Sequence, residues 1–140
     1  MRNTALLIDT NIVLDWILCR EPFHANAKAI IELCINNEVQ GYLACHTILN
    51  MFYILRKERS IAQRKEILLM LCNSFDIIGI DHKMLIEVLC SDSLKDIEDD
   101  MQMQCAVEKE LDYIITRNIK DFKDSKVKAM LPEDFLALRR

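Results

Sequence analysis

Short apolar runs alternate along this chain with longer segments whose apolar residues recur at helical spacing. The runs occupy residues 5–8, 42–45, 75–80 and 113–116, with a weaker fifth run at 127–130. Continuous runs of this length are typical of strands buried on both faces of a sheet. Strands that alternate with helices form βαβ units. The pattern therefore predicts an α/β fold with three layers, α/β/α, around a mostly parallel central sheet of four to five strands.

The segments between these runs carry signals for helix starts. Pro22 is expected to open the second helix, because proline is favoured in a first helical turn. Ser60 and Gln63 have the spacing of a capping box, which predicts a helix from there through residue 72. A later helix is expected to start near Asp96 and to run to Leu111. Further residues placed at helix starts are Thr10, Asn11, Thr47 and Pro132.

The composition limits the class of protein. The 140 residues, 51% of them hydrophobic and 29% charged, predict one globular domain over residues 1–140. No apolar run approaches the roughly 20 residues of a membrane span, so no membrane association is expected. The first four residues lead straight into the first apolar run, without the pattern of a secretory signal. A cytoplasmic protein is therefore expected.

Cysteine usage and charge narrow the prediction further. The six cysteines are scattered, without zinc-site spacing and mostly beside apolar residues, which predicts free buried thiols in a reducing compartment. The net charge of −4 and the pI of about 5.4 argue against a broad basic surface for nucleic acid. They leave room for a local basic rim, and they suit a basic partner peptide.

Asp9 directly follows the first apolar run, Ala5–Ile8. In open α/β sheets, functional groups lie at the carboxyl ends of the strands, so Asp9 is a candidate site residue. The alternative is that Asp9 only caps the helix that follows.

A second acidic region precedes the fourth apolar run. Acids in the first turn of a helix are favoured by its dipole, by roughly 0.3–1 kcal/mol each, and one or two would need no other reason. Five acids within nine positions repel one another, and a bound divalent cation would relieve that repulsion. If the region is helical, positions 92, 96 and 99 share one face. The five acids are Asp92, Asp96, Glu98, Asp99 and Asp100.

Polar residues also follow the fourth run directly. In a parallel sheet, Asp9 and Asn118 would emerge at the same edge, and the helix of Asp96 and Asp99 could lie across that edge. Oxygen ligands from these places suit Mg²⁺ or Mn²⁺. Capping or surface roles are expected for His24, His46 and His82.

Together these segments resemble the PIN domain family, and more narrowly its PilT N-terminus/VapC-like branch. The resemblance covers essentially the whole chain and depends on the order and spacing of motifs that are weak individually. It implies a Mg²⁺- or Mn²⁺-dependent nuclease, often a ribonuclease toxin that a cognate antitoxin holds inactive, and commonly a homodimer. The matching motifs are Leu7–Asn11, Asp96–Asp99, Tyr113–Asn118 with Asp121 and Phe122, and the closing segment Leu131–Leu136.

The resemblance assigns the family's metal-site acids to Asp9 and Asp99, with Asp96 as an additional acid. Asn118 or Asp121 would hold the last, variable polar position. The chain departs from the family at Asn50, where a glutamate is usual in the helix after the second strand. An asparagine can bind a metal through its carbonyl oxygen, but it adds no charge.

The resulting hypothesis is hydrolysis of phosphodiester bonds in single-stranded RNA by water that attacks phosphorus in line, with one or two divalent ions held by Asp9, Asp96 and Asp99. Supporting residues would orient the ligands, and basic residues would contact phosphates. The supporting residues are Thr10, Asn11 and Thr116, and the basic residues are Arg117, Lys120 and Lys123.

Two other interpretations remain open. A non-catalytic module that binds RNA or a protein partner would explain Asn50 and the acidic pI, and it predicts no cleavage with any metal. A phosphoacceptor signalling domain would use an acid after a middle strand, as Asp81 follows the third apolar run. Labelling by acetyl phosphate would distinguish this third possibility from a nuclease.

Overall fold

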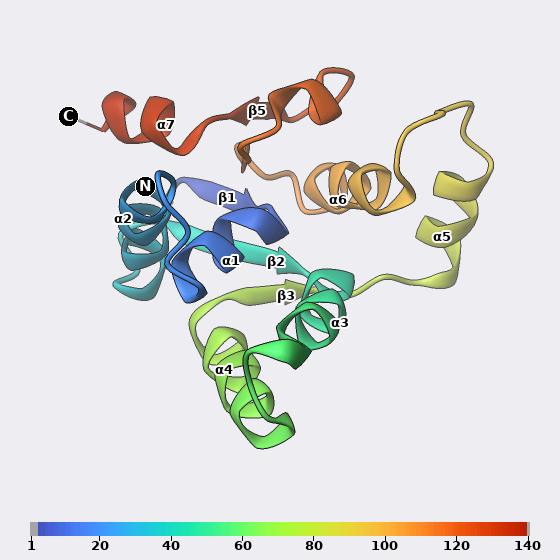
Figure 1. Cartoon of the computed structure of the whole chain (residues 1–140). Coiled ribbons are helices and arrows are strands. Elements are labelled where there is room, and N and C mark those ends of the chain that lie inside the picture. The colour runs from blue at the N-terminus through green and yellow to red at the C-terminus, as the bar shows by residue number, and fades with distance from the viewer. Residues whose placement is uncertain (1–2, 140) are drawn as a thin grey trace.

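The computed structural model of the chain describes residues 3–139 and contains a five-stranded sheet in the order β3-β2-β1-β4-β5 (Figure 1). Every neighbouring pair is parallel. This confirms the predicted α/β class and the parallel sheet. The strands are β1 (Ala5–Ile8), β2 (Gln40–Ala44), β3 (Asp76–Ile78), β4 (Tyr113–Ile115) and β5 (Lys128–Met130).

Helices connect the strands and cover both faces of the sheet. The predicted capping box forms at the start of α4, where the backbone N–H of Gln63 donates to Ser60 Oγ at 3.1 Å and the N–H of Ser60 donates to Gln63 Oε1 at 2.9 Å. The helices are α1 (Thr10–Ile17), α2 (His24–Ile35), α3 (Cys45–Ile54), α4 (Ile61–Ser74), α5 (His82–Leu89), α6 (Ile97–Glu108) and α7 (Pro132–Leu138), with 3₁₀ turns η1 (Leu55–Lys57) and η2 (Ile119–Phe122).

Several predicted helix starts were wrong. Asp9, not Thr10 or Asn11, holds the capping position of α1, although its side chain makes no capping hydrogen bond. Thr47 lies inside α3, because that helix begins as soon as β2 ends at Ala44. One further start differs, because α2 begins at His24 rather than Pro22. The start of α6 is as predicted, with Asp96 at the capping position and Ile97 as the first helical residue, which leaves Asp92 outside the helix.

The core is divided by the sheet into two clusters. Leu6 and Ile8 of β1 pack on the face covered by α1, α2, α3, α4 and α7, whereas Ala5 and Leu7 pack on the face covered by α5 and α6. Alternate side chains of a strand point to opposite faces, so a strand covered on both faces is apolar at every position. The helices on either face make this a three-layer arrangement (Figure 1).

Close approach of β2 to its covering helices depends on Gly41. A Cβ atom at this position would lie 2.7 Å from Cys34 Sγ of α2 and 2.7 Å from Cδ1 of Phe75, which follows α4. A contact that short requires the neighbours to move. The absence of a side chain at position 41 therefore sets the distance between β2 and this helical layer.

The cysteines differ in burial from what was predicted. All six cysteines are free, but only Cys34 and Cys105 are buried, and Cys19, Cys72 and Cys90 are exposed. Within residues 3–139, no helix has the length and apolar character needed to cross a bilayer. Residues 1–2, part of the segment in which no secretory signal is expected, lie outside the described residues.

The order in which strands are added to the sheet reverses between β1 and β4. From β1 the chain builds β2 and β3 on one side, and β4 and β5 lie on the other. In open α/β sheets, ligands bind outside the carboxyl ends of the strands at such a switch point. Ile8 of β1 is in register with Ile115 of β4, so the next residues, Asp9 and Thr116, leave the sheet side by side.

Candidate functional site

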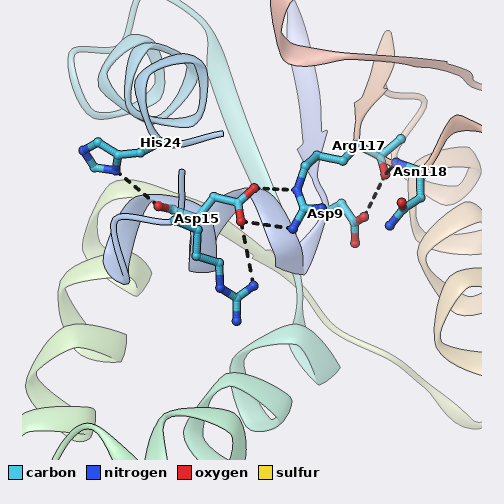
Figure 2. A network of polar contacts seen from close by, with 7 residues as sticks. Asp9, Asp15, His24, Arg117 and Asn118 are labelled. Atoms are coloured by element: carbon cyan, nitrogen blue, oxygen red, sulfur yellow. Dashed lines mark hydrogen bonds and ion pairs between the residues drawn. The ribbon is translucent and has the colours of Figure 1, made fainter. Parts of the chain in front are cut away.

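Asp9 lies at this switch point, with its carboxylate held from two sides. It is only 5% exposed. Gln102 Nε2 of α6 donates to Asp9 Oδ1 at 2.9 Å, and Thr116 Oγ1 donates to Asp9 Oδ2 at 2.8 Å. The Thr116 hydroxyl in turn accepts from the backbone N–H of Asn118 at 3.0 Å (Figure 2). Both donors are neutral, so they orient the carboxylate and leave its charge uncompensated.

The first turn of α6 brings further acids to Asp9. Burial, followed by the nearby carboxylates of Asp9, Asp121, Asp96 and Glu98, raises the pKa of Asp99 to about 7. The structure thus gathers acids from the end of β1, the start of α6 and η2 closely enough to oppose the ionisation of Asp99. A carboxyl group with this pKa is about half protonated at neutral pH, and a divalent cation among these acids would favour its ionised form.

Asp96 belongs to the same cluster of acids and also caps a helix. It occupies the capping position of α6, where its Oδ1 accepts from the backbone N–H of Glu98 at 2.8 Å. An acid at the start of a helix is also favoured by the helix dipole. Its charge still acts on Asp99.

The start of α3 forms another wall of the site. Thr10 Oγ1 donates to Thr47 Oγ1 at 3.1 Å, and His46 Nε2 donates to the backbone carbonyl of Glu98 at 3.2 Å. Burial lowers the pKa of His46, against the opposing effects of this hydrogen bond and of nearby carboxylates. Asn50 lies three residues after Thr47 and four after His46, so it shares their face of α3. This places Asn50 on the side of α3 that meets the acidic site.

The basic residues after β4 have different environments. Arg117, predicted to contact substrate, instead forms two hydrogen bonds with the carboxylate of Asp15, at 2.7 and 3.1 Å. Lys120 and Lys123 are exposed, in and just after η2. Asn11 is half-buried in the first turn of α1.

The residues present fit a hard divalent cation. Within the described part of the chain, no three His, Cys, Asp or Glu side chains are arranged as a ready metal cage. Mg²⁺ does not need such a cage, because proteins commonly bind it through one or two carboxylates while it keeps several waters. Asp9 and Asp99 supply such a pair, and their mutual repulsion is what a cation would relieve.

Sequence reasoning missed Gln102 and Asp15. Gln102 lies three residues after Asp99, hence on a nearby part of the same helix, and is buried although polar. Its Oε1 is buried without a hydrogen-bond partner among the described residues. Asp15 interrupts the apolar sequence of α1 and is fully buried. A polar residue amid an apolar helix face was the available signal in both cases.

Asp81, considered as a phosphoacceptor, lies elsewhere. It caps α5, where its Oδ1 accepts from the backbone N–H of Met84 at 2.8 Å. It follows β3, an edge strand separated from β1 by β2. The residue therefore has a local structural role and lies away from the switch point.

The sequence matches the profile of the PIN domain over residues 5–120. A search among curated proteins gives no match. Several solved structures share the fold at low sequence identity. A chain of a toxin-antitoxin complex from Klebsiella pneumoniae is 23% identical, with a TM-score of 0.69 over 91% of this chain and 97% of that one.

Two further solved structures extend this likeness. A chain of VapBC2 from Rickettsia felis, bound to a DNA fragment from the promoter, is 17% identical, with a TM-score of 0.67 over 91% of this chain and 98% of that one. VapC20 from Mycobacterium tuberculosis, a toxin that cleaves the sarcin-ricin loop, is 10% identical, with a TM-score of 0.61 over 78% and 86%. At these identities the likeness establishes the shared fold.

Proposed function

This chain belongs to the PIN domain family, and from that premise we propose that it is a divalent-metal-dependent endoribonuclease, the toxin of a toxin-antitoxin pair. Its reaction would be hydrolysis of phosphodiester bonds in single-stranded RNA. The observation that carries the proposal is the pairing of Asp9 with Asp99 at the carboxyl edge of the sheet, where burial and the nearby carboxylates raise the pKa of Asp99 to about 7.

Each side chain of the site has its own role in the proposed reaction. Asp9 and Asp99 would hold Mg²⁺ or Mn²⁺, with Asp96 as a further acid beside them. When bound, the cation supplies charge that offsets the phosphate and acidifies water. Gln102 and Thr116 keep both oxygens of Asp9 in place. The exposed Lys120 and Lys123 would contact phosphates beside the acidic centre.

The proposal includes partners. The similar solved structures include VapBC and FitAB complexes with antitoxins, some of them bound to DNA, which supports an antitoxin partner for this chain. The net charge of −4 favours a basic segment in that partner. A homodimer is part of the same proposal, by analogy with the family.

A cleavage assay on mixed RNAs with Mn²⁺, Mg²⁺ or EDTA tests the activity. We expect cleavage with the metals, none with EDTA, and none for Asp9→Asn. Asp81→Asn is a matched control, because it also removes the charge of an acid that follows a strand but lies outside the site. Full activity of Asp9→Asn would refute the mechanism.

A second candidate function is a non-catalytic module that binds RNA or a protein. The residue that favours it is Asn50, an uncharged side chain on the face of α3 that meets the site. It predicts that the wild-type chain binds RNA in a fluorescence anisotropy titration and leaves it intact with every metal. Asn50→Glu, which restores the family's usual acid, would then be expected to gain cleavage.

A further inference from the structure

The two segments that carry Asp9 and Thr116 make a second contact, between Asp15 and Arg117, which follow these residues in the chain. Asp15 lies in α1, which Asp9 begins, and Arg117 directly follows Thr116. Arg117 Nε donates to Asp15 Oδ2 at 2.7 Å, and Arg117 Nη2 donates to Asp15 Oδ1 at 3.1 Å (Figure 2). The loop after β4 is therefore attached to α1 at two adjacent points.

The surroundings of this pair restrict its geometry. Asp15 is fully buried, and the side chain of Arg117 is 23% exposed. The Arg117 guanidinium lies over the ring of Phe23, 4.0 Å from its centroid. Arg20 approaches Asp15 Oδ1 at 3.7 Å, and His24 Nδ1 donates to the backbone carbonyl of Asp15 at 3.2 Å (Figure 2). The α1–α2 connection thus closes over the ion pair.

Stability alone is a weak reason for such a pair. Removing two charges from water offsets much of their attraction, and apolar residues of similar volume often serve as well. A bidentate arginine–carboxylate contact fixes the relative orientation of the two side chains, because both hydrogen bonds from the planar guanidinium form only over a narrow range of carboxylate orientations. A lysine carries the same charge without that constraint.

We propose that Asp15 and Arg117 are positioning residues for Asp9. By fixing residue 117 against α1, the pair sets where the Thr116 hydroxyl and the Asn118 backbone N–H lie, and so sets the orientation of the Asp9 carboxylate. Neither side chain has a part in contacting RNA. The catalytic consequence rests on the proposed ribonuclease function, whereas the geometric part does not.

The test uses the full chain with Arg117→Lys, Arg117→Gln and Asp15→Asn. Arg64→Lys is the matched control, because Arg64 is also buried, lies over the ring of Phe52 and donates to a backbone carbonyl, but belongs to α4. We expect all three site variants to lower kcat by about tenfold or more, as small misplacements of reacting groups do, with KM within about threefold. Arg64→Lys should keep the wild-type kcat.

An arginine that contacts substrate would behave differently. Arg117→Lys would then retain most activity, Asp15→Asn would leave kcat unchanged, and the loss in Arg117→Gln would fall on KM and vary with salt. Because Asp15 and Arg117 act as a unit in our proposal, Asp15→Asn combined with Arg117→Gln should cost no more than either alone. Additive losses, or a wild-type kcat in Arg117→Lys, would overturn the proposal.

A measurement that does not depend on cleavage separates the positioning role of Asp15 and Arg117 from the proposed ribonuclease function. The side-chain carboxyl ¹³C signal of Asp9 and the side-chain amide ¹⁵N signal of Gln102, which donates to Asp9, report on the orientation of the Asp9 carboxylate in NMR spectra. We expect both signals to shift in Arg117→Lys and to stay in place in Arg64→Lys, while thermal melts confirm that each variant is folded. If the wild type cleaves no RNA, the ribonuclease function fails and these shifts still decide the positioning role. Unshifted signals in Arg117→Lys would refute it.

Discussion

The hydroxyl of Thr116 makes two hydrogen bonds within the candidate site. It donates to Asp9 and accepts from the Asn118 N–H, and it is fully buried. Thr116→Val would leave both partners without this bond. We expect the free energy of unfolding, measured in urea, to fall by about 1–3 kcal/mol, and cleavage to fall with it. Ser60→Ala removes a hydroxyl that caps α4 away from Asp9, so it controls for a loss of stability alone.

Asp99 predicts a pH dependence of stability. Because burial and its acidic neighbours raise the pKa of Asp99 from 3.8 to about 7, the folded chain binds more protons than the unfolded chain between these values. This contribution to stability is fully present below pH 3.8 and is lost as pH rises towards 7. Allowing for solvent at this half-buried group, we expect about 1 kcal/mol from urea melts of the metal-free protein.

Asp99→Asn is the matching variant, because an amide cannot ionise. Its stability should change less between pH 4 and 7 than that of the wild type. An equal slope in both proteins would contradict the raised pKa. With Mn²⁺ present the wild-type slope should diminish, because the cation favours the ionised carboxylate.

Single residues also show where the sequence was informative. Asp9 could be placed at a strand end because an apolar run stops there. Thr116 was named in advance as a residue that would orient ligands, whereas Gln102 was not, because it is 93 residues from Asp9 and only the fold brings the two close. The partner of Arg117 was not recognised either, because the buried Asp15 is 102 residues away along the chain.

Among the elements, the contact of β2 with α2 and the end of α4 gives a stability prediction. Gly41→Ala places a methyl group within 2.7 Å of Cys34 and Phe75, so the layers must separate. We expect unfolding in urea to require about 1–3 kcal/mol less free energy. Gly79→Ala is the control, because a Cβ there meets nothing within 4 Å, and we expect a change within about 0.5 kcal/mol. Equal effects of the two variants would contradict this account.

The type of each element was predictable, and its first residue often was not. Apolar runs identify strands because burial on both faces requires apolar residues at every position. Helix starts were predicted from capping propensity, which succeeded at Ser60 and failed at Thr47. Thr47 is instead buried against Thr10, so a tertiary contact determined its place.

For the whole molecule, metal binding should appear as stability. A ligand that binds only the folded chain adds about 2.7 kcal/mol at 100 times its Kd, which corresponds to a rise in Tm of roughly 10 °C for a chain of this size. We expect Mn²⁺ to produce this rise, EDTA to reverse it, and Asp9→Asn to abolish it. A rise of the same size in Asp9→Asn would place the metal elsewhere.

The order of the strands is a property of the whole molecule that the sequence pattern did not predict. Alternating elements imply a parallel sheet, but they do not say which strands are neighbours. In the structure β4 lies beside β1, so the switch falls between these two strands. An edge of the sheet and acids such as Asp9 and Asp99 could therefore be proposed for the site in advance, whereas Gln102, which donates to Asp9, could not.

The hydroxyl that aims Asp9 comes from a residue 107 positions later in the chain. During synthesis on a ribosome, Asp9 therefore emerges long before Thr116 and the strand that follows it. A nascent chain carries an unfinished centre until those later residues have emerged and folded. Under the proposed function, a polypeptide released before Thr116 would hold the first acid of the site without the hydroxyl that orients it.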